Sequence, residues 1–165
     1  MMRDQGAHFY RCDFQVHTPR DAQWQGARPT SDAERHRYAT DFIAACRKQG
    51  LEAVAITDHH DLAMLPLIRS AAQTETTPTG KTVSEEEQLV VFPGVELTLG
   101  IPCQAVLILD ANFPDDLLSD VLKILNIEEV DHTEHKLPVV TCLHHINDFH
   151  DLCEILDQRA WLKGR

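Results

Sequence analysis

The sequence lacks the signals of membrane, secreted and redox proteins. No stretch approaches the roughly 20 apolar residues of a membrane-spanning helix, and residues 1–12 carry Arg3, Asp4 and Arg11 in place of the apolar segment of a signal peptide. The 5 cysteines are odd in number, and no two have the CxxC spacing of a metal or redox motif. We therefore expect a cytoplasmic protein with reduced thiols and no membrane partner.

Positive charge is also scarce in this chain. It has 15 lysine and arginine residues against 26 aspartate and glutamate residues, which gives a formal net charge of -11. This balance argues against nucleic-acid binding through a basic surface patch. Bound divalent cations would weaken that argument, because they would supply positive potential locally. No nucleotide-binding motif is present either.

What the sequence does contain is four polar clusters, each at the end of an apolar run. The clusters are Asp13-Phe14-Gln15-Val16-His17, Thr57-Asp58-His59-His60, Pro93-Gly94-Val95-Glu96 and Leu143-His144-His145. Imidazole and carboxylate groups that reach one point from several strand ends make a metal site, because nitrogen and oxygen donors suit Zn, Mn or Fe. The series of clusters therefore predicts a metal centre.

The order of elements predicts an α/β fold in one domain, for which 165 residues are sufficient. The predicted strands are residues 9–16, 51–56, 89–92, 105–109 and 139–143. The predicted helices are residues 31–48, 64–72, 115–126 and 147–158, the first opening with a Ser31–Glu34 capping box. Alternating strands and helices favour a parallel sheet with right-handed crossovers. In barrels of this kind the site lies at the carboxyl ends of the strands, where all four clusters fall.

Two strings resemble motifs of the polymerase and histidinol phosphatase (PHP) superfamily of metal-dependent phosphoesterases. They are Gly50-Leu51-Glu52-Ala53-Val54-Ala55-Ile56-Thr57-Asp58-His59 and Phe92-Pro93-Gly94-Val95-Glu96. The resemblance covers nearly the whole chain, so residues 1–165 are interpreted as a single PHP-like domain. It implies a distorted TIM-like (β/α)7 barrel, two or three divalent metal ions (Zn, Mn, Fe or Mg) and the hydrolysis of phosphate esters.

Carried over residue by residue, the resemblance implies a set of metal ligands. They are Gln15, His17, His59, Glu96 and His144, with His145 as the alternative to His144. The family usually has histidine where this chain has Gln15 and Gln104, and a neutral amide oxygen is a poorer donor, so the site is expected to hold fewer ions or harder ones. The family's last Asp-x-His motif is absent and two strands are missing. The chain is therefore interpreted as the front part of a larger protein that continues beyond Arg165.

Several neighbouring side chains have two interpretations each. Asp58 either binds metal or, as we favour, orients His59. His60 either points away or protonates a leaving group. Arg20 either clamps a phosphate or is a solvated charge. Asp21 is either a turn residue or a further ligand.

Two further sequence features have a simpler interpretation. Asp13 is expected to brace the first loop. His132 and His135 have a zinc-like i, i+3 spacing, but their polar surroundings favour a solvated segment.

The predicted reaction is the attack of a metal-activated water on phosphorus. DNA, RNA or a nucleotide is the preferred substrate, because similar PHP segments are often fused to ATPases of the chromosome-maintenance and AAA types, some of them in phage defence. The alternative is a degenerate PHP module that has lost catalysis and acts as a scaffold in such a complex. Gln15 and Gln104 are the evidence for this alternative.

Overall fold

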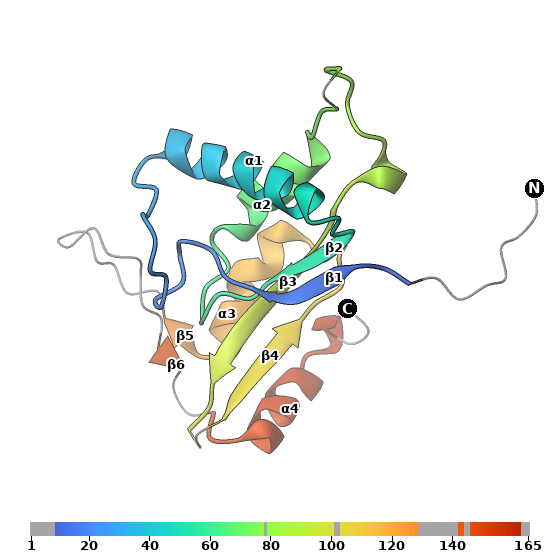
Figure 1. Cartoon of the computed structure of the whole chain (residues 1–165). Coiled ribbons are helices and arrows are strands. Elements are labelled where there is room, and N and C mark those ends of the chain that lie inside the picture. Colours follow the sequence, from blue (N-terminus) through green and yellow to red (C-terminus); the bar gives the residue numbers. More distant parts are fainter. Residues whose placement is uncertain (1–8, 78, 101–102, 129–141, 144–145, 163–165) are drawn as a thin grey trace, which may run out of the picture.

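A computed structural model describes residues 9–77, 79–100, 103–128, 142–143 and 146–162. Four strands form one sheet in chain order: β1 (Cys12–Val16), β2 (Ala53–Ile56), β3 (Val90–Thr98) and β4 (Gln104–Ile108). β1, β2 and β3 are parallel to one another, whereas β4 is antiparallel to β3. The sheet curls as a half-barrel (Figure 1). The fold is thus mixed α/β, and a closed barrel of the PHP type stays a prediction.

In the described residues four α-helices accompany the sheet: α1 (Asp32–Lys48), α2 (Leu65–Gln73), α3 (Leu118–Ile124) and α4 (Phe149–Asp157). The predicted capping box of α1 is confirmed, because Ser31 accepts from the amide of Glu34 and Glu34 reaches back to the amide of Ser31. Gly50 follows the helix with φ 68°, the left-handed conformation that commonly ends helices. α1 packs against α2, and α2 packs on β3 (Figure 1).

The structure corrects three predictions about the strands. β3 does not stop at Phe92 but continues to Thr98, because its second half pairs with β4. The connection from β3 to β4 is a hairpin, so the sheet is not wholly parallel. Of the predicted fifth strand, residues 139–141 lie outside the described residues. The remainder, β6 (Cys142–Leu143), pairs with an unpredicted strand, β5 (Ile127–Glu128), and not with the four-stranded sheet.

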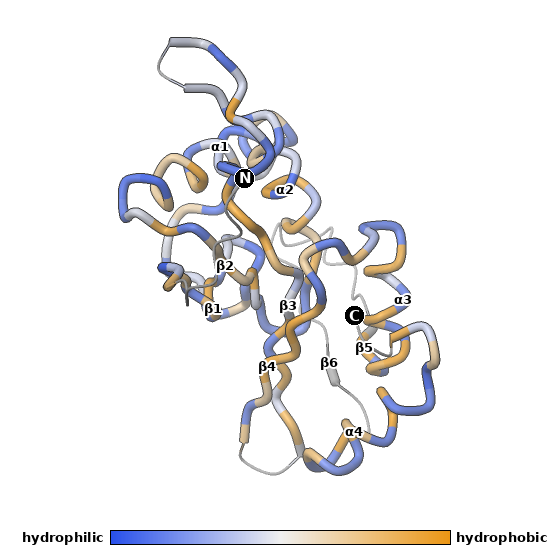
Figure 2. The backbone as a smooth tube through the Cα atoms, turned by 90° about the vertical axis from the view of Figure 1, so that its right-hand side faces the viewer, coloured by the Kyte–Doolittle hydropathy of each residue, from blue (hydrophilic) through white to orange (hydrophobic). Residues whose placement is uncertain are grey.

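One hydrophobic core joins the sheet to the helices. Its innermost side chains come from β2, α2, β3 and α3, and include Val54, Ile68, Leu97 and Val121. Hydrophobic residues line β2 and β3, while the helices also carry hydrophilic residues (Figure 2). None of the helices in the described part of the chain has the length and apolar character needed to cross a bilayer.

Candidate metal centre

Polar residues of three segments meet at one edge of the sheet because β1, β2 and β3 are parallel neighbours. His17 follows β1 directly, and residues 57–60 follow β2. The chain beyond β2 stays beside β3, since the amide of Glu96 donates to the carbonyl of Asp58 (3.2 Å) and the amide of His60 donates to the carbonyl of Glu96 (3.1 Å). The ends of β1 and β2 and the last third of β3 therefore deliver their side chains to the same place.

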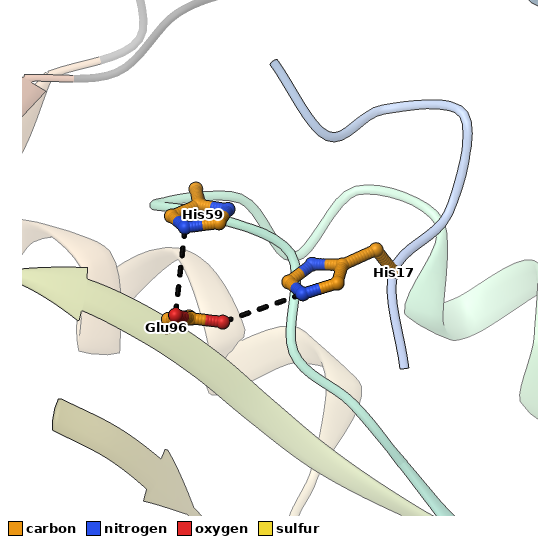
Figure 3. Close-up of side chains that lie close together, drawn as sticks. All are labelled: His17, His59 and Glu96. Carbon is orange, nitrogen blue, oxygen red and sulfur yellow. Dashed lines mark ion pairs between the residues drawn. The ribbon is translucent and has the colours of Figure 1, made fainter. Parts of the chain in front are cut away.

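Two imidazole rings face one buried carboxylate at this place. Nε2 of His17 lies 3.3 Å from Oε2 of Glu96, and Nε2 of His59 lies 3.5 Å from Oε1 of the same side chain (Figure 3). The two rings are stacked, with centroids 5.1 Å apart and planes 12° from parallel. Glu96 is only 2% exposed. Three of the ligands implied by the resemblance thus lie together.

Asp21 contacts the far side of both rings. Its Oδ2 atom lies 2.8 Å from Nδ1 of His59 and accepts the backbone amide of His59 at 2.8 Å. An ionised carboxylate only accepts hydrogen bonds, so Nδ1 of His59 donates to Asp21, which leaves Nε2 as the ring nitrogen on the side of Glu96. Nδ1 of His17 also lies 2.8 Å from Oδ2, although this contact lacks hydrogen-bond geometry.

Hydrogen bonds offset the effect of burial on Asp21. Burial alone would raise the pKa of Asp21, but hydrogen bonds from the backbone and ring of His59 and from the backbone of Gln23 hold that pKa below its ordinary value. Asp21 therefore does more than form a turn, which was one of its two interpretations from the sequence. The sequence placed it in a loop, four residues after His17, but contained no sign that it would reach His59.

Asp58 has a different partner from the one predicted. Both of its oxygens accept hydrogen bonds from Thr18, one from the backbone amide and one from the hydroxyl, each at 2.5 Å. The orientation of His59, which we assigned to Asp58, falls to Asp21 instead. Burial raises the pKa of Asp58 to about 6; the hydrogen bonds from Thr18 oppose this rise, and the negative charges of Asp61 and Asp21 add to it.

Three glutamine side chains surround the histidine and glutamate cluster. Gln15 donates from Nε2 to Oε2 of Glu96 at 3.0 Å. Nε2 of Gln104 lies 3.1 Å from Nε2 of His59, and Nε2 of Gln23 lies 3.4 Å from the same ring atom. Gln15 and Gln104 are thus at the cluster as the resemblance implies. Gln23 was missed, because a glutamine in a polar loop carries no distinguishing signal.

The other two predicted catalytic side chains are engaged near the cluster. Arg20 forms an ion pair with buried Asp61, donating from Nη2 at 2.7 Å and from Nε at 3.0 Å. His60 has a positive φ of 56°, and its Nε2 atom accepts the backbone amide of Thr98 at 3.0 Å. Asp13 accepts the amide of Gln15 through Oδ1 at 3.2 Å, at the end of β1.

Four predicted or considered residues lie outside the described residues: His132, His135, His144 and His145. The cluster is therefore built here from the first three polar segments only.

The described side chains suit a divalent metal ion. Donor atoms lie within 4.8 Å of one another in two groups: His17, His59 and Glu96, and His17, Asp21 and Asp58. Tetrahedral ligands at ~2.0–2.1 Å from one ion are about 3.4 Å apart, close to the 3.3 and 3.5 Å separations at Glu96. Within the described residues, neither Glu96 nor Asp58 has an ion pair with lysine or arginine. Buried carboxylates need a positive partner, which a cation would provide.

Comparisons of this chain with protein-family models, with curated proteins and with solved structures found no match.

Proposed function

We propose that this protein is a metal-dependent hydrolase of phosphate esters. The observation that carries the proposal is the meeting of His17, His59 and buried Glu96, with imidazole nitrogens 3.3 and 3.5 Å from the two carboxylate oxygens and no lysine or arginine paired with Glu96 in the described residues. The resemblance of the surrounding strings to PHP motifs supports the phosphoesterase class. A divalent ion held there by His17, His59 and Glu96 would lower the pKa of water and neutralise phosphate charge.

The chain's own residues divide the work of such a site. His17, His59 and Glu96 offer the donor atoms, and Asp21 fixes the ring of His59 so that Nε2 faces Glu96. Arg20 is held by Asp61, so we assign it to supporting the loop and not to clamping a phosphate. Nε2 of His60 accepts the backbone amide of Thr98. This favours the interpretation in which His60 points away from the site over the one in which it donates a proton to a leaving group.

The substrate we favour is a phosphodiester of DNA, RNA or a nucleotide. The protein's formal charge of -11 offers no electrostatic attraction to such a substrate, so bound cations have to supply it. The fusion to an ATPase, the role in phage defence, the cytoplasmic location and the number of two or three ions remain predictions from the sequence.

A second candidate function is that of a scaffold domain without catalysis. Its support is the ring of amides, because Gln15, Gln23 and Gln104 place N–H groups against Glu96 and His59 where further ligands would otherwise bind. Hydrogen bonds from these amides stabilise the cluster without a metal. The two candidates differ in whether Glu96 and His59 are needed for a reaction or only for the fold.

Metal content and cleavage, measured on the same preparations, test the proposal. The wild type, Glu96→Gln and the control Glu86→Gln, which changes an exposed glutamate, are purified without chelator for elemental analysis. Each is assayed on single-stranded DNA, RNA and bis(p-nitrophenyl) phosphate. We expect at least one Zn, Mn or Fe ion per chain and metal-dependent cleavage in the wild type and control, with both lost in Glu96→Gln.

The other outcomes separate the two candidates. A wild type that retains metal but cleaves none of these substrates would favour the scaffold. A folded wild type without metal would overturn the proposed hydrolase altogether.

A further inference from the structure

The loop between β1 and α1 is built around one arginine side chain. Arg28 donates from Nη1 to the carbonyls of Pro19 (2.5 Å) and Asp21 (2.8 Å), and from Nη2 to those of Trp24 (3.1 Å) and Ala22 (3.4 Å). Four carbonyl groups of residues 19–24 therefore point toward a single guanidinium. The loop wraps around this side chain instead of forming regular secondary structure.

This arrangement needs a cation with several donors. Carbonyl oxygens that converge carry like partial charges, and a planar guanidinium with five N–H groups satisfies several of them at once. Lysine offers a compact charge on a flexible stem and cannot occupy the same fork of positions. Among the described residues Arg28 has no carboxylate partner, and its four hydrogen bonds all go to backbone carbonyls of this loop.

The loop that Arg28 holds carries Asp21, the residue that orients the imidazole of His59. Asp21 has its carbonyl bound by Arg28 and its amide bound to the carbonyl of Thr18 at 2.9 Å. Its side chain then reaches Nδ1 of His59 at 2.8 Å. Because both the amide and the carbonyl of Asp21 are hydrogen-bonded, its carboxylate is held in place even though the loop contains no helix or strand.

We propose that Arg28 is a positioning residue of the metal centre, acting through Asp21 on His59. This inference rests on the proposed function, since it concerns the affinity of the same site for its metal. Residues that orient metal-binding histidines typically change metal affinity by about 10- to 100-fold. Arg28 stands one contact further away, so we expect an effect of about tenfold.

The protein contains a matched control for this proposal. Arg69 also donates to three backbone carbonyls, those of Val91, Ala111 and Phe113, and it pairs with Asp115. It joins α2 to β3 and to the segment before α3, and none of these four partners belongs to the metal centre. Loss of Arg69 should therefore cost stability without changing how the imidazoles are oriented.

The test compares the wild type, Arg28→Ala, Arg28→Lys and Arg69→Ala. Zinc affinity is measured by competition with a chromophoric chelator, and thermal unfolding is measured with and without zinc. We expect both alanine variants to unfold at lower temperature than the wild type, but only Arg28→Ala to lose about tenfold in zinc affinity. Arg28→Lys should fold with an intermediate affinity, and it keeps the test valid if Arg28→Ala does not fold.

Three results would count against the proposal. Arg28 variants with zinc affinity within twofold of the wild type would show that Asp21 is held without Arg28. An equal loss in Arg69→Ala would show that affinity merely follows stability. A wild type that binds no zinc, manganese or iron would overturn the proposed function itself, and the role of Arg28 with it.

Discussion

One face of β3 is apolar and exposed at one end and charged and buried at the other. Val90, Phe92, Gly94 and Glu96 share this face because alternate residues of a strand point the same way. Val90 is 42% exposed, whereas Glu96 is 2% exposed. Burial of apolar groups and exposure of charged ones is the usual pattern. The burial of Glu96 indicates that the charged end of this face is not shaped by stability alone.

The neighbouring strands extend the same contrast. At the apolar end, Phe14 of β1 is 46% exposed and meets Phe92 edge to face, with ring centroids 5.6 Å apart. These rings help to line a groove of about 570 Å³. At the charged end, Asp21 and Asp58 are buried beside His17 and His59. The charged end costs folding energy and is expected to repay it by binding metal, whereas the apolar end is expected to contribute only to the fold.

The prediction with the largest expected effect concerns the free-energy cost of burying the carboxylate of Asp58. Its pKa is about 6 in the folded protein against 3.8 for the free side chain. The folded state therefore holds the proton more tightly than the unfolded state. In metal-free protein the stabilisation that comes from protonated Asp58 is fully present below about pH 4. It is lost as pH rises through 6, so the free energy of unfolding falls over this range. The difference of roughly two pKa units corresponds to about 3 kcal/mol.

Asp58→Asn should remove this pH dependence. Urea unfolding of chelator-treated wild type and variant between pH 4 and pH 7.5 measures it, and the difference between the two proteins isolates Asp58 from the other acidic groups. We expect the variant to gain stability relative to the wild type as pH rises through this window. A difference that stays constant with pH would show that burying this carboxylate carries no cost.

A second test concerns the orientation of the imidazoles at the charged end. Asp21→Asn keeps the size of the side chain but replaces the charged acceptor that holds Nδ1 of His59. We expect metal affinity to fall by about 10- to 100-fold, the usual effect of losing such a partner. Isothermal titration with zinc or manganese measures this affinity, and Asp120→Asn, which changes a surface residue, serves as the control. An unchanged affinity would leave Asp21 as a turn residue only.

Local signals in the sequence predicted much of the fold. The Ser31–Glu34 capping box and Gly50 marked both ends of α1, and apolar periodicity marked α4 within two residues at its start. The extent of β3 was missed because Pro93 and Gly94 suggested a strand end. Gly94 instead permits close packing, since a Cβ atom there would lie 2.8 Å from Cγ2 of Thr57. The antiparallel direction of β4 depends on pairing that no local signal records.

Local signals in the sequence also predicted part of the candidate site. His17, His59 and Glu96 follow apolar runs, so their approach could be expected from the meeting of strand ends. The partners of the carboxylates could not be predicted, because Asp21 reaches His59 across 38 positions and Thr18 reaches Asp58 across 40. Such contacts depend on how the loop folds over the sheet edge, and here that path depends on backbone hydrogen bonds to Arg28.

The smallest test concerns the apolar end of the same face. Phe92→Ala removes a half-buried ring that contacts Phe14, so we expect the free energy of unfolding to fall by about 1–2 kcal/mol, below the 3–5 kcal/mol of fully buried rings. A double-mutant cycle with Phe14→Ala should give a coupling of about 0.5–1 kcal/mol. Metal affinity should stay within twofold of the wild type, because Phe92 precedes Glu96 by about 13 Å of strand. If affinity instead fell tenfold, the two ends would be coupled, and the apolar end would belong to the site.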